Sequence, residues 1–444
     1  MWEYLPPRFR LRGTPHPGER NAMQLSKDFE RFRDGLPRPL ESYILTTYGI
    51  DLTSVYGGLR VKNPFGKASG QLSLARHQVE RDAASGLGFV VLKTVIAQDR
   101  RGEQTMREWA IPETRMLVEP ICGRSGDRGW TVTWKGRGWF DSFAAYLELF
   151  DQALTVVEEA GMQVAPSVKY HLPTPKEDFW KEDEYTFTTQ ALLEVWKRHR
   201  GEQVMPLEKD FSPTLAGSER AAEQAKILEW LGTVPRLVHC AAPGRVHVGL
   251  KIFNALFEDE FQLRMLEAVE AAPPGEERAD FVVYANRLFD PAKQFEGKVG
   301  VAYGGPDLSD RNLAGLEKFL ALKSGGREPG RVPERLPVSA TGDIHSGRMA
   351  AEYLLRGASS FQMHTLFQLP DSEFAMRAGN KTDKALHHLL FHPQDGFLAW
   401  ALDLRERVGL QNAQNVAETA TWCRDHWDKI IESLDHCVIE PSGD

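Results

Sequence analysis

The chain has 444 residues, of which 42% are apolar and 26% are charged, so it is long enough to bury the core of one large domain or two ordinary ones. Its formal net charge is −8 and no basic block stands out, which argues against a nucleic acid or an anionic membrane as partner. The four cysteines, Cys122, Cys240, Cys423 and Cys437, form no Cys-x-x-Cys pair, which argues against an iron–sulfur cluster, a zinc ribbon or a disulfide framework.

Targeting and membrane signals are not visible in the sequence. No basic segment followed by an apolar core stands near Met1, and no window approaches the ~18 apolar residues of a membrane-spanning helix. We therefore expect a soluble, cytoplasmic protein without a membrane span.

Residues 1–57 are polar and rich in Arg and Pro, and are expected to form an N-terminal extension with helices near 27–32 and 40–48. From Gly58 onward, short apolar runs alternate with segments of helical period. Strands are expected at 64–70, 88–95, 163–170, 203–211, 246–253, 280–286, 336–341 and 359–365, with helices at 75–85, 142–160, 188–199, 218–231, 261–271, 312–322 and before Gly357. After Pro370 the pattern is helical only, so 58–369 are expected to form one domain and 370–444 a helical appendage packed on it or on a second subunit.

Strands that alternate with helices pair in parallel, and eight of them predict a closed (β/α)8 barrel. An open doubly wound sheet is the alternative; it is disfavoured because no Gly-x-Gly-x-x-Gly follows the first strand. In a barrel, phosphate groups are commonly bound by the loops after strands 7 and 8. Residues 336–367 occupy these positions, and the turns near Gly342 and Gly347 would direct backbone N–H groups at an anion. This stretch predicts a phosphate site.

Several pieces of sequence, in their order and spacing, are similar to those of one enzyme family. They are Asn63-Pro-Phe-Gly-Lys-Ala-Ser-Gly70, Gly88-Phe-Val-Val-Leu-Lys-Thr-Val95, Tyr303-Gly-Gly305, and Ala340-Thr-Gly-Asp-Ile344 with Gly357-Ala-Ser and Phe361-Gln. Together they resemble the FMN-binding barrel of dihydroorotate dehydrogenases and of the C-terminal part of dihydropyrimidine dehydrogenase, from about Gly58 to Phe367. The resemblance implies an FMN-dependent oxidoreductase that passes hydride between a small cyclic, pyrimidine-like substrate and flavin N5.

Lys93 and Lys251 end the second and fifth strands, where their ammonium groups would point into the barrel mouth and would require an anion or acceptor. The resemblance implies that both contact FMN; pairing with a carboxylate at the mouth is the alternative. The other cofactor-binding residues that it implies are Ala68, Ser69, Thr94, Gly304, Gly305, Gly342, Asp343, His364 and Thr365. Asp343 stands where the family usually has a second glycine, and its carboxylate would repel a phosphate unless it turned outward or took a cation.

Ser212 follows the fourth strand and precedes Pro213, where the family carries a catalytic Ser or Cys. There it would assist proton transfer at the carbon next to the hydride donor; a helix N-cap or turn serine is the alternative. Asn254 and Asn286 are expected to bind the substrate as amides that pair with a cyclic imide or carboxamide. Residues 100–140 form an insertion rich in Arg and Trp, which replaces the family's substrate-binding asparagine loop near 116–139. Its arginines could hold a carboxylate and its tryptophans could stack on a ring; the alternative is that they form the solvated edge and the core of a lid. These residues are Arg124, Arg128, Arg137, Trp130, Trp134 and Trp139.

Two other functions stay open from the sequence: a flavin-free lyase in which Lys93 or Lys251 forms a Schiff base, and a barrel that acts without catalysis as a binding or assembly subunit. A homodimer also stays open. No spacing of His, Asp and Glu suggests a metal ion. Because no iron–sulfur cysteines are present, electrons are expected to pass to a soluble acceptor, to oxygen or to a partner not identified by the sequence.

Overall fold

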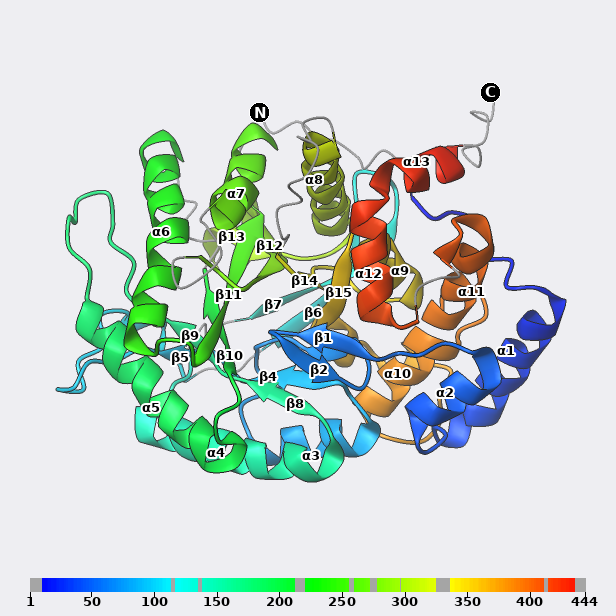
Figure 1. Cartoon of the computed structure of the whole chain (residues 1–444), viewed down its shortest axis with the longest axis horizontal. Coiled ribbons are helices and arrows are strands. Elements are labelled where there is room, and N and C mark those ends of the chain that lie inside the picture. Colours follow the sequence, from blue (N-terminus) through cyan, green and yellow to red (C-terminus); the bar gives the residue numbers. More distant parts are fainter. Residues whose placement is uncertain are drawn as a thin grey trace.

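A computed structural model describes residues 10–112, 116–134, 138–211, 220–254, 259–271, 278–295, 297–324, 336–410 and 414–435. In these residues, parallel strands occupy the centre of the molecule and helices surround them (Figure 1). The parallel strands are β3 (Phe65–Lys67), β4 (Phe89–Val91), β8 (Gln163–Ala165), β9 (Ser167–Lys169), β10 (Met205–Asp210), β11 (Val246–Asn254), β12 (Phe281–Phe295), β14 (Val338–Thr341) and β15 (Ala358–Met363).

The strands pair in the order β9-β10-β11-β12-β14-β15-β3-β4-β8. The two ends of this path meet because β8 and β9 are successive segments of one strand that is interrupted at Pro166. A short strand, β5 (Val95–Ile96), follows β4 and also pairs with β9. The eight strands expected from the sequence are therefore confirmed, and the fold is a (β/α)8 barrel.

The helices that cover the ring are α3 (Arg76–Ser85), α4 (Phe143–Ala160), α5 (Glu182–Arg200), α6 (Arg220–Ala241), α7 (Asp259–Ala271), α8 (Pro306–Ser324) and α9 (Gly347–Leu355). Helix α4 shows how the sequence sets their limits. The side chain of Ser142 accepts a hydrogen bond from the backbone N–H of Ala145, and Gly161 ends the helix in the left-handed conformation. Between these caps, apolar residues at helical spacing are buried against the barrel.

The N-terminal end of the barrel is closed by an antiparallel hairpin of β1 (Ser54–Tyr56) and β2 (Leu59–Val61), which the sequence did not predict. The ring of Tyr56 stacks on Phe89 with centroids 4.1 Å apart and meets Phe281 edge-on. With this end filled by aromatic side chains, ligands have to enter at the opposite end, where the strands finish. We call that C-terminal end the mouth.

Helices α1 (Glu19–Arg31) and α2 (Leu40–Tyr48) precede the barrel; α10 (Lys381–Phe391), α11 (Phe397–Arg407), α12 (Val416–Asp425) and α13 (Trp427–Asp435) follow it. On one side of the molecule, α1 packs on α10 and α11 (Figure 1). One large hydrophobic cluster includes residues from Leu11 to Leu434, so both terminal regions pack in the same cluster as the barrel strands and helices. No helix of the described part of the chain is long and apolar enough to cross a membrane.

Two hairpins extend beyond the ring at the mouth. Strand β12 continues past the barrel and pairs antiparallel with β13 (Lys298–Tyr303). The insertion predicted at 100–140 contains the antiparallel strands β6 (Met116–Cys122) and β7 (Arg128–Trp134). Strand β7 packs against β13, α8 and the 3-10 helix η4 (Thr365–Gln368) that follows β15.

Candidate functional site

Three lysines lie at the mouth, near the ends of three strands. Phe89 and Val91 of β4 belong to the cluster that fills the barrel axis, so Lys93, two residues further on, is on the same face of the chain. Lys169 ends β9, and Lys251 lies in β11. Only 5%, 2% and 3% of the surfaces of Lys93, Lys169 and Lys251 are exposed, so these charges have little solvation by water.

Two carboxylates of β10 partly compensate this charge. The Oδ2 atom of Asp210 lies 3.1 Å from the Nζ atom of Lys169, and Oε2 of Glu208 lies 4.0 Å from Nζ of Lys251. Burial by itself raises the pKa of Asp210, but the positive charges of Lys169 and Lys251 outweigh it and the pKa is lowered overall. Asp210 is therefore ionised at neutral pH.

Burial and the positive charges that the two carboxylates leave uncompensated lower the pKa values of Lys93 and His364. Burial lowers the pKa of Lys93 to about 7; Asp210 opposes this decrease, whereas Lys169 and Lys251 add to it. The Nζ atom of Lys93 donates to Oε1 of Gln71 at 3.1 Å. Burial also holds the pKa of His364 well below its usual value, with further lowering by surrounding cations, of which Arg287, Lys93, Lys67 and Lys251 are the main ones. The mouth is thus a place where an added negative charge would be stabilised.

Below the lysines, Glu208 anchors a polar layer across the barrel. Its Oε1 atom accepts hydrogen bonds from the hydroxyl of Tyr56 at 2.7 Å and from the amide of Gln362. Gln362 and Ser360 of β15 both reach Ser339 of β14. Burial raises the pKa of Glu208 although Lys251 opposes the change. This layer links the plug at the N-terminal end to the lysines at the mouth.

The loop after β3 forms another wall of the mouth. The hydroxyls of Ser69, Thr94 and Ser167 form a chain across three neighbouring strands, with oxygen–oxygen distances of 2.8 and 3.0 Å. Ala68 is buried beside them, and a Cβ atom added to Gly70 would meet the ring of His364 at 2.4 Å. Small residues are therefore required here, as expected of a wall that a planar ligand approaches closely.

The glycines predicted to bind phosphate lie around the first turn of α8 and the end of β14. Gly305 has φ 101° directly before α8, and Gly304 donates its backbone N–H to the hydroxyl of Thr131 in β7 at 3.0 Å. Gly342 has φ 108°, and a Cβ atom at this position would lie 2.6 Å from the side-chain nitrogen of Asn312. At Gly305 and Gly342, only glycine fits the backbone conformation and the close contacts without strain.

Asp343 adopts φ 55°, a left-handed conformation that explains why glycine is common at this point of the resembling family. Its carboxylate accepts a hydrogen bond from the hydroxyl of Ser309 at 2.9 Å and lies 3.3 Å from the ring of His345. Burial by itself lowers the pKa of His345, but Asp343 outweighs it and the pKa is raised overall. Asp343 therefore has two partners within the chain, the hydroxyl of Ser309 and the ring of His345, whose protonated form it stabilises.

Other residues expected at the site have different surroundings. Both ends of the Asn254 amide are engaged by α8, since its nitrogen donates to Asn312 at 2.8 Å and its oxygen accepts from Arg311. Asn286 is half-buried near the point where β12 leaves the ring, and Thr365 begins η4. Ser212, with Pro213 and Thr214, lies outside the described residues. The predicted roles of these residues in substrate binding and proton transfer stay predictions.

The insertion contributes aromatic rings and backbone to the mouth rather than a row of arginines. The ring centroid of Trp109 lies 4.8 Å from the Nζ atom of Lys169. The backbone N–H of Trp139 donates to the carbonyl of Thr94 at 2.6 Å. Arg124 and Arg128 are exposed, and Arg137 lies outside the described residues.

Sequence reasoning missed four charged residues of the mouth, namely Lys169, Glu208, Asp210 and Arg287. Lys169 ends a predicted strand exactly as Lys93 does, so the same rule would have found it. The two carboxylates were inside a predicted strand, and only its alternation could have shown that they face the axis. Arg287 donates to the carbonyls of Val132 and Ala302, contacts that depend on two hairpins the sequence did not reveal.

The side chains of the mouth fit FMN. Lys93 and Lys251 suit an electron-accepting ring edge, the small residues around Ala68 allow close approach of a flat ring, and the loops at Gly305 and Gly342 suit a phosphate. The Asp343 carboxylate, which would otherwise repel a phosphate, has Ser309 and His345 as partners within the chain. Among the described residues, no group of three or more His, Cys, Asp or Glu could hold a metal ion.

Comparison with known proteins supports the fold. No family model matches the chain, and no curated protein matches it. Among solved structures, the chain is similar to DHODH, dihydroorotate dehydrogenase, from Eimeria tenella, solved in complex with ferulenol. The TM-score is 0.51 with 12% sequence identity, over 91% of this chain and 94% of that one. At this identity the similarity establishes that the two chains share the barrel fold.

Proposed function

We propose that the chain is an FMN-dependent oxidoreductase that transfers hydride between a small cyclic, pyrimidine-like substrate and the flavin. The observation that carries the proposal is the convergence of Lys93, Lys169 and Lys251 in a buried barrel mouth with Asp210 and Glu208 as the nearby carboxylates. Such a cluster favours an anionic or electron-accepting ligand. The fold shared with a dihydroorotate dehydrogenase supports the choice of flavin.

When bound, FMN would supply the hydride-accepting centre at N5. Lys93 and Lys251 would hold its ring by charge, and Ala68 and Ser69 would lie beneath the ring. The N–H groups of the loops at Gly305, Gly342 and Thr365 would bind the phosphate, and protonated His345 would keep Asp343 from repelling it. Neutral His364 would serve as a hydrogen-bonding group rather than a second cation.

Ser212 is our candidate for the residue that moves the substrate proton, from its position after β10. Asn286 and, after release from α8, Asn254 would orient the substrate through amide hydrogen bonds. We also propose that the barrel domain spans 58–369, between the N-terminal extension and the helical appendage.

The purified full-length protein tests this proposal directly. A yellow preparation that releases FMN on denaturation, and whose flavin is bleached by a cyclic imide or amide substrate, would support it. A colourless preparation that fails to bind added FMN, measured by quenching of flavin fluorescence, would refute it. Replacing Lys251 by Ala should lower the FMN occupancy of the protein. Lys62→Ala is the control, because Lys62 is a half-buried lysine that follows β2 at the opposite end of the barrel.

A second candidate function rests on the low pKa of Lys93. Burial lowers this pKa to about 7, so a fraction of the amine is unprotonated at neutral pH and able to attack a carbonyl group. A flavin-free lyase would use Lys93 in this way. Borohydride trapping of a carbonyl substrate on the wild-type protein, but not on Lys93→Arg, would favour this function over the first.

A further inference from the structure

The β6–β7 hairpin lies over the loops that we assign to the cofactor. Its Thr131 accepts the N–H of Gly304, and Arg287 donates to the carbonyl of Val132. A Cβ atom on Gly129 would lie 2.8 Å from Pro306 at the start of α8. The hairpin therefore stands between this part of the mouth and solvent.

The hairpin has a buried inner strand and a looser outer part. Thr131, Val132 and Thr133 of β7 are buried, whereas β6 and the turn are held mainly by polar contacts. Along β6, half-buried and exposed residues alternate, and Leu117 is 42% exposed. Near its turn, the N–H of Arg124 donates to Oδ1 of Asp307 in α8 at 2.7 Å. Because β6 and the turn have no fully buried residue, this outer part of the hairpin opens at a lower free energy than the barrel core does.

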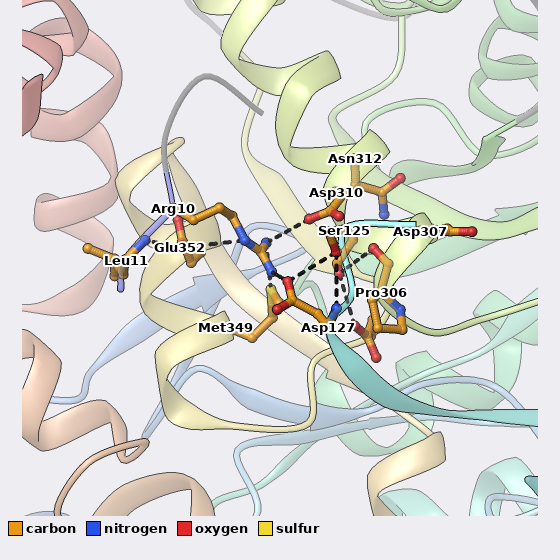
Figure 2. Close-up of polar contacts among 12 residues, drawn as sticks. Arg10, Leu11, Ser125, Asp127, Pro306, Asp307, Asp310, Asn312, Met349 and Glu352 are labelled. Carbon is orange, nitrogen blue, oxygen red and sulfur yellow. Dashed lines mark hydrogen bonds and ion pairs between the residues drawn. The ribbon is translucent and has the colours of Figure 1, made fainter. Parts of the chain in front are cut away.

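Arg10 joins this hairpin to two helices (Figure 2). Its guanidinium lies 3.5 Å from Asp310 of α8, 3.9 Å from Glu352 of α9 and 4.0 Å from Asp127 in the hairpin turn. Asp310 and Glu352 are almost fully buried, whereas 58% of the Asp127 side chain is exposed. The first two contacts hold Arg10 in place, and the third reaches the hairpin.

The segment that carries Arg10 is itself fixed on the helical side. Leu11 is buried, and its N–H donates to Oε1 of Glu352 at 2.5 Å. Further along, the N–H of His16 donates to Asp403 of α11 at 3.2 Å. Arg10 is thus held in place by α8 and α9. In its contact with the hairpin, the partner that can move away is the exposed side chain of Asp127.

We propose that Arg10 is a positioning residue that fastens the β6–β7 hairpin over the mouth, so that the hairpin acts as a lid on the ligand site. The identity of the ligand rests on the proposed function, but the contact between Arg10 and the hairpin does not. Opening would separate Asp127 from Arg10 and Arg124 from Asp307, and it would uncover Gly304 and Gly305. Closing would restore these contacts and exclude water from the mouth.

Hydrogen–deuterium exchange on the full chain without added ligand tests the fastening. Arg10→Ala and Asp127→Ala should each speed exchange of the backbone amides of 116–134 by about two- to fivefold, as expected for a partly exposed ion pair. The double variant should exchange no faster than the faster of the two single variants, since both substitutions remove the same Arg10–Asp127 contact. Arg12→Ala, at an exposed position of the same segment, should leave the hairpin unchanged.

Unchanged exchange in Asp127→Ala would overturn the proposal even if Arg10→Ala loosened the hairpin, because Arg10 would then act through α9 alone. In FMN-loaded protein, Asp127→Ala should raise the association and dissociation rates by the same factor and leave the Kd unchanged. A changed Kd with an unchanged dissociation rate would also overturn the lid. If the protein bound no FMN, the exchange result would still decide the proposal.

Discussion

The Nζ atom of Lys169 and the Oδ2 atom of Asp210 lie 3.1 Å apart at the ends of the neighbouring strands β9 and β10. Asp210 also lowers the electrostatic repulsion between Lys169 and two other buried lysines, Lys93 and Lys251. One carboxylate therefore stabilises a cluster whose cations otherwise repel each other.

Replacing Asp210 by Asn should lower the free energy of unfolding by about 2–4 kcal/mol, because breaking a largely buried ion pair leaves its partner uncompensated. Urea denaturation at pH 7 measures this change. Asp178→Asn, at an exposed position, is the control and should change stability by less than about 0.5 kcal/mol. An equally small loss in both variants would show that Asp210 does not stabilise the cluster.

The barrel could be predicted because each strand of a parallel sheet is buried on both faces and forms a continuous apolar run between turns. The runs 88–95 and 246–253 are examples; they contain the ring strands β4 and β11. The β1–β2 plug was missed because its short strands are not buried on both faces, with Arg60 exposed between Leu59 and Val61, so they form no continuous apolar run. The insertion was recognised, but its pairing between 116–122 and 128–134 depends on contacts with α8 and β13.

The site was predicted less completely, for a physical reason. A lysine at a strand end is visible in the sequence, so Lys93 and Lys251 were named. The partners of a charge are set by the register between strands, as for Asp210 opposite Lys251 across β10 and β11. Likewise, the cation that neutralises Asp343 is His345, and their proximity follows from a left-handed turn rather than from a motif.

The hydroxyl of Tyr56 is a further test of the polar layer. Tyr56→Phe should lower the free energy of unfolding by about 1–3 kcal/mol, the range for a buried acceptor that loses its donor, because the carboxyl group of Glu208 loses the Tyr56 hydroxyl. Tyr170→Phe is the matched control, since its buried hydroxyl meets only the neutral hydroxyl of Thr189 at 2.7 Å. We expect about 0.5–1.5 kcal/mol there. If the control lost as much stability as Tyr56→Phe, the hydrogen bond to Glu208 would be no stronger than one between two neutral hydroxyls.

The affinity for FMN should fall as the pH rises above 7. Lys93 has a pKa of about 7 in the free protein, and an anionic ligand nearby favours its charged form and so raises that pKa. Below pH 7 the amine is charged in both states and the affinity is maximal. Between 7 and the raised pKa, binding has to recruit a proton, and the Kd should increase up to about tenfold per pH unit. Flavin fluorescence from pH 6 to 9 measures the Kd, and Lys93→Gln should bind weakly with this dependence removed.

Ser212→Ala should slow reduction of the flavin by substrate far more than it weakens FMN binding, because the serine is proposed to move a proton and not to hold the cofactor. General acid–base groups commonly contribute about 10²–10⁴-fold to a rate. Rapid mixing of the loaded enzyme with substrate measures reduction, and Ser218→Ala serves as a serine control in the same region of the sequence. Equal reduction rates in wild type and Ser212→Ala would remove Ser212 from the mechanism.

His345→Ala should weaken FMN binding at pH 6 because it leaves the Asp343 carboxylate, 3.3 Å away in the wild type, without its cation. The raised pKa of His345 means that this cation is fully present below pH 6.5 and is lost as the pH rises through the raised value. We expect the Kd to increase by about three- to tenfold, the effect of one like charge near the phosphate in a polar site. Asp343→Gly removes that carboxylate and suits the left-handed backbone, so the same change of His345 in this background should have little effect. An equal loss of affinity in both backgrounds would instead mean that His345 binds the ligand directly.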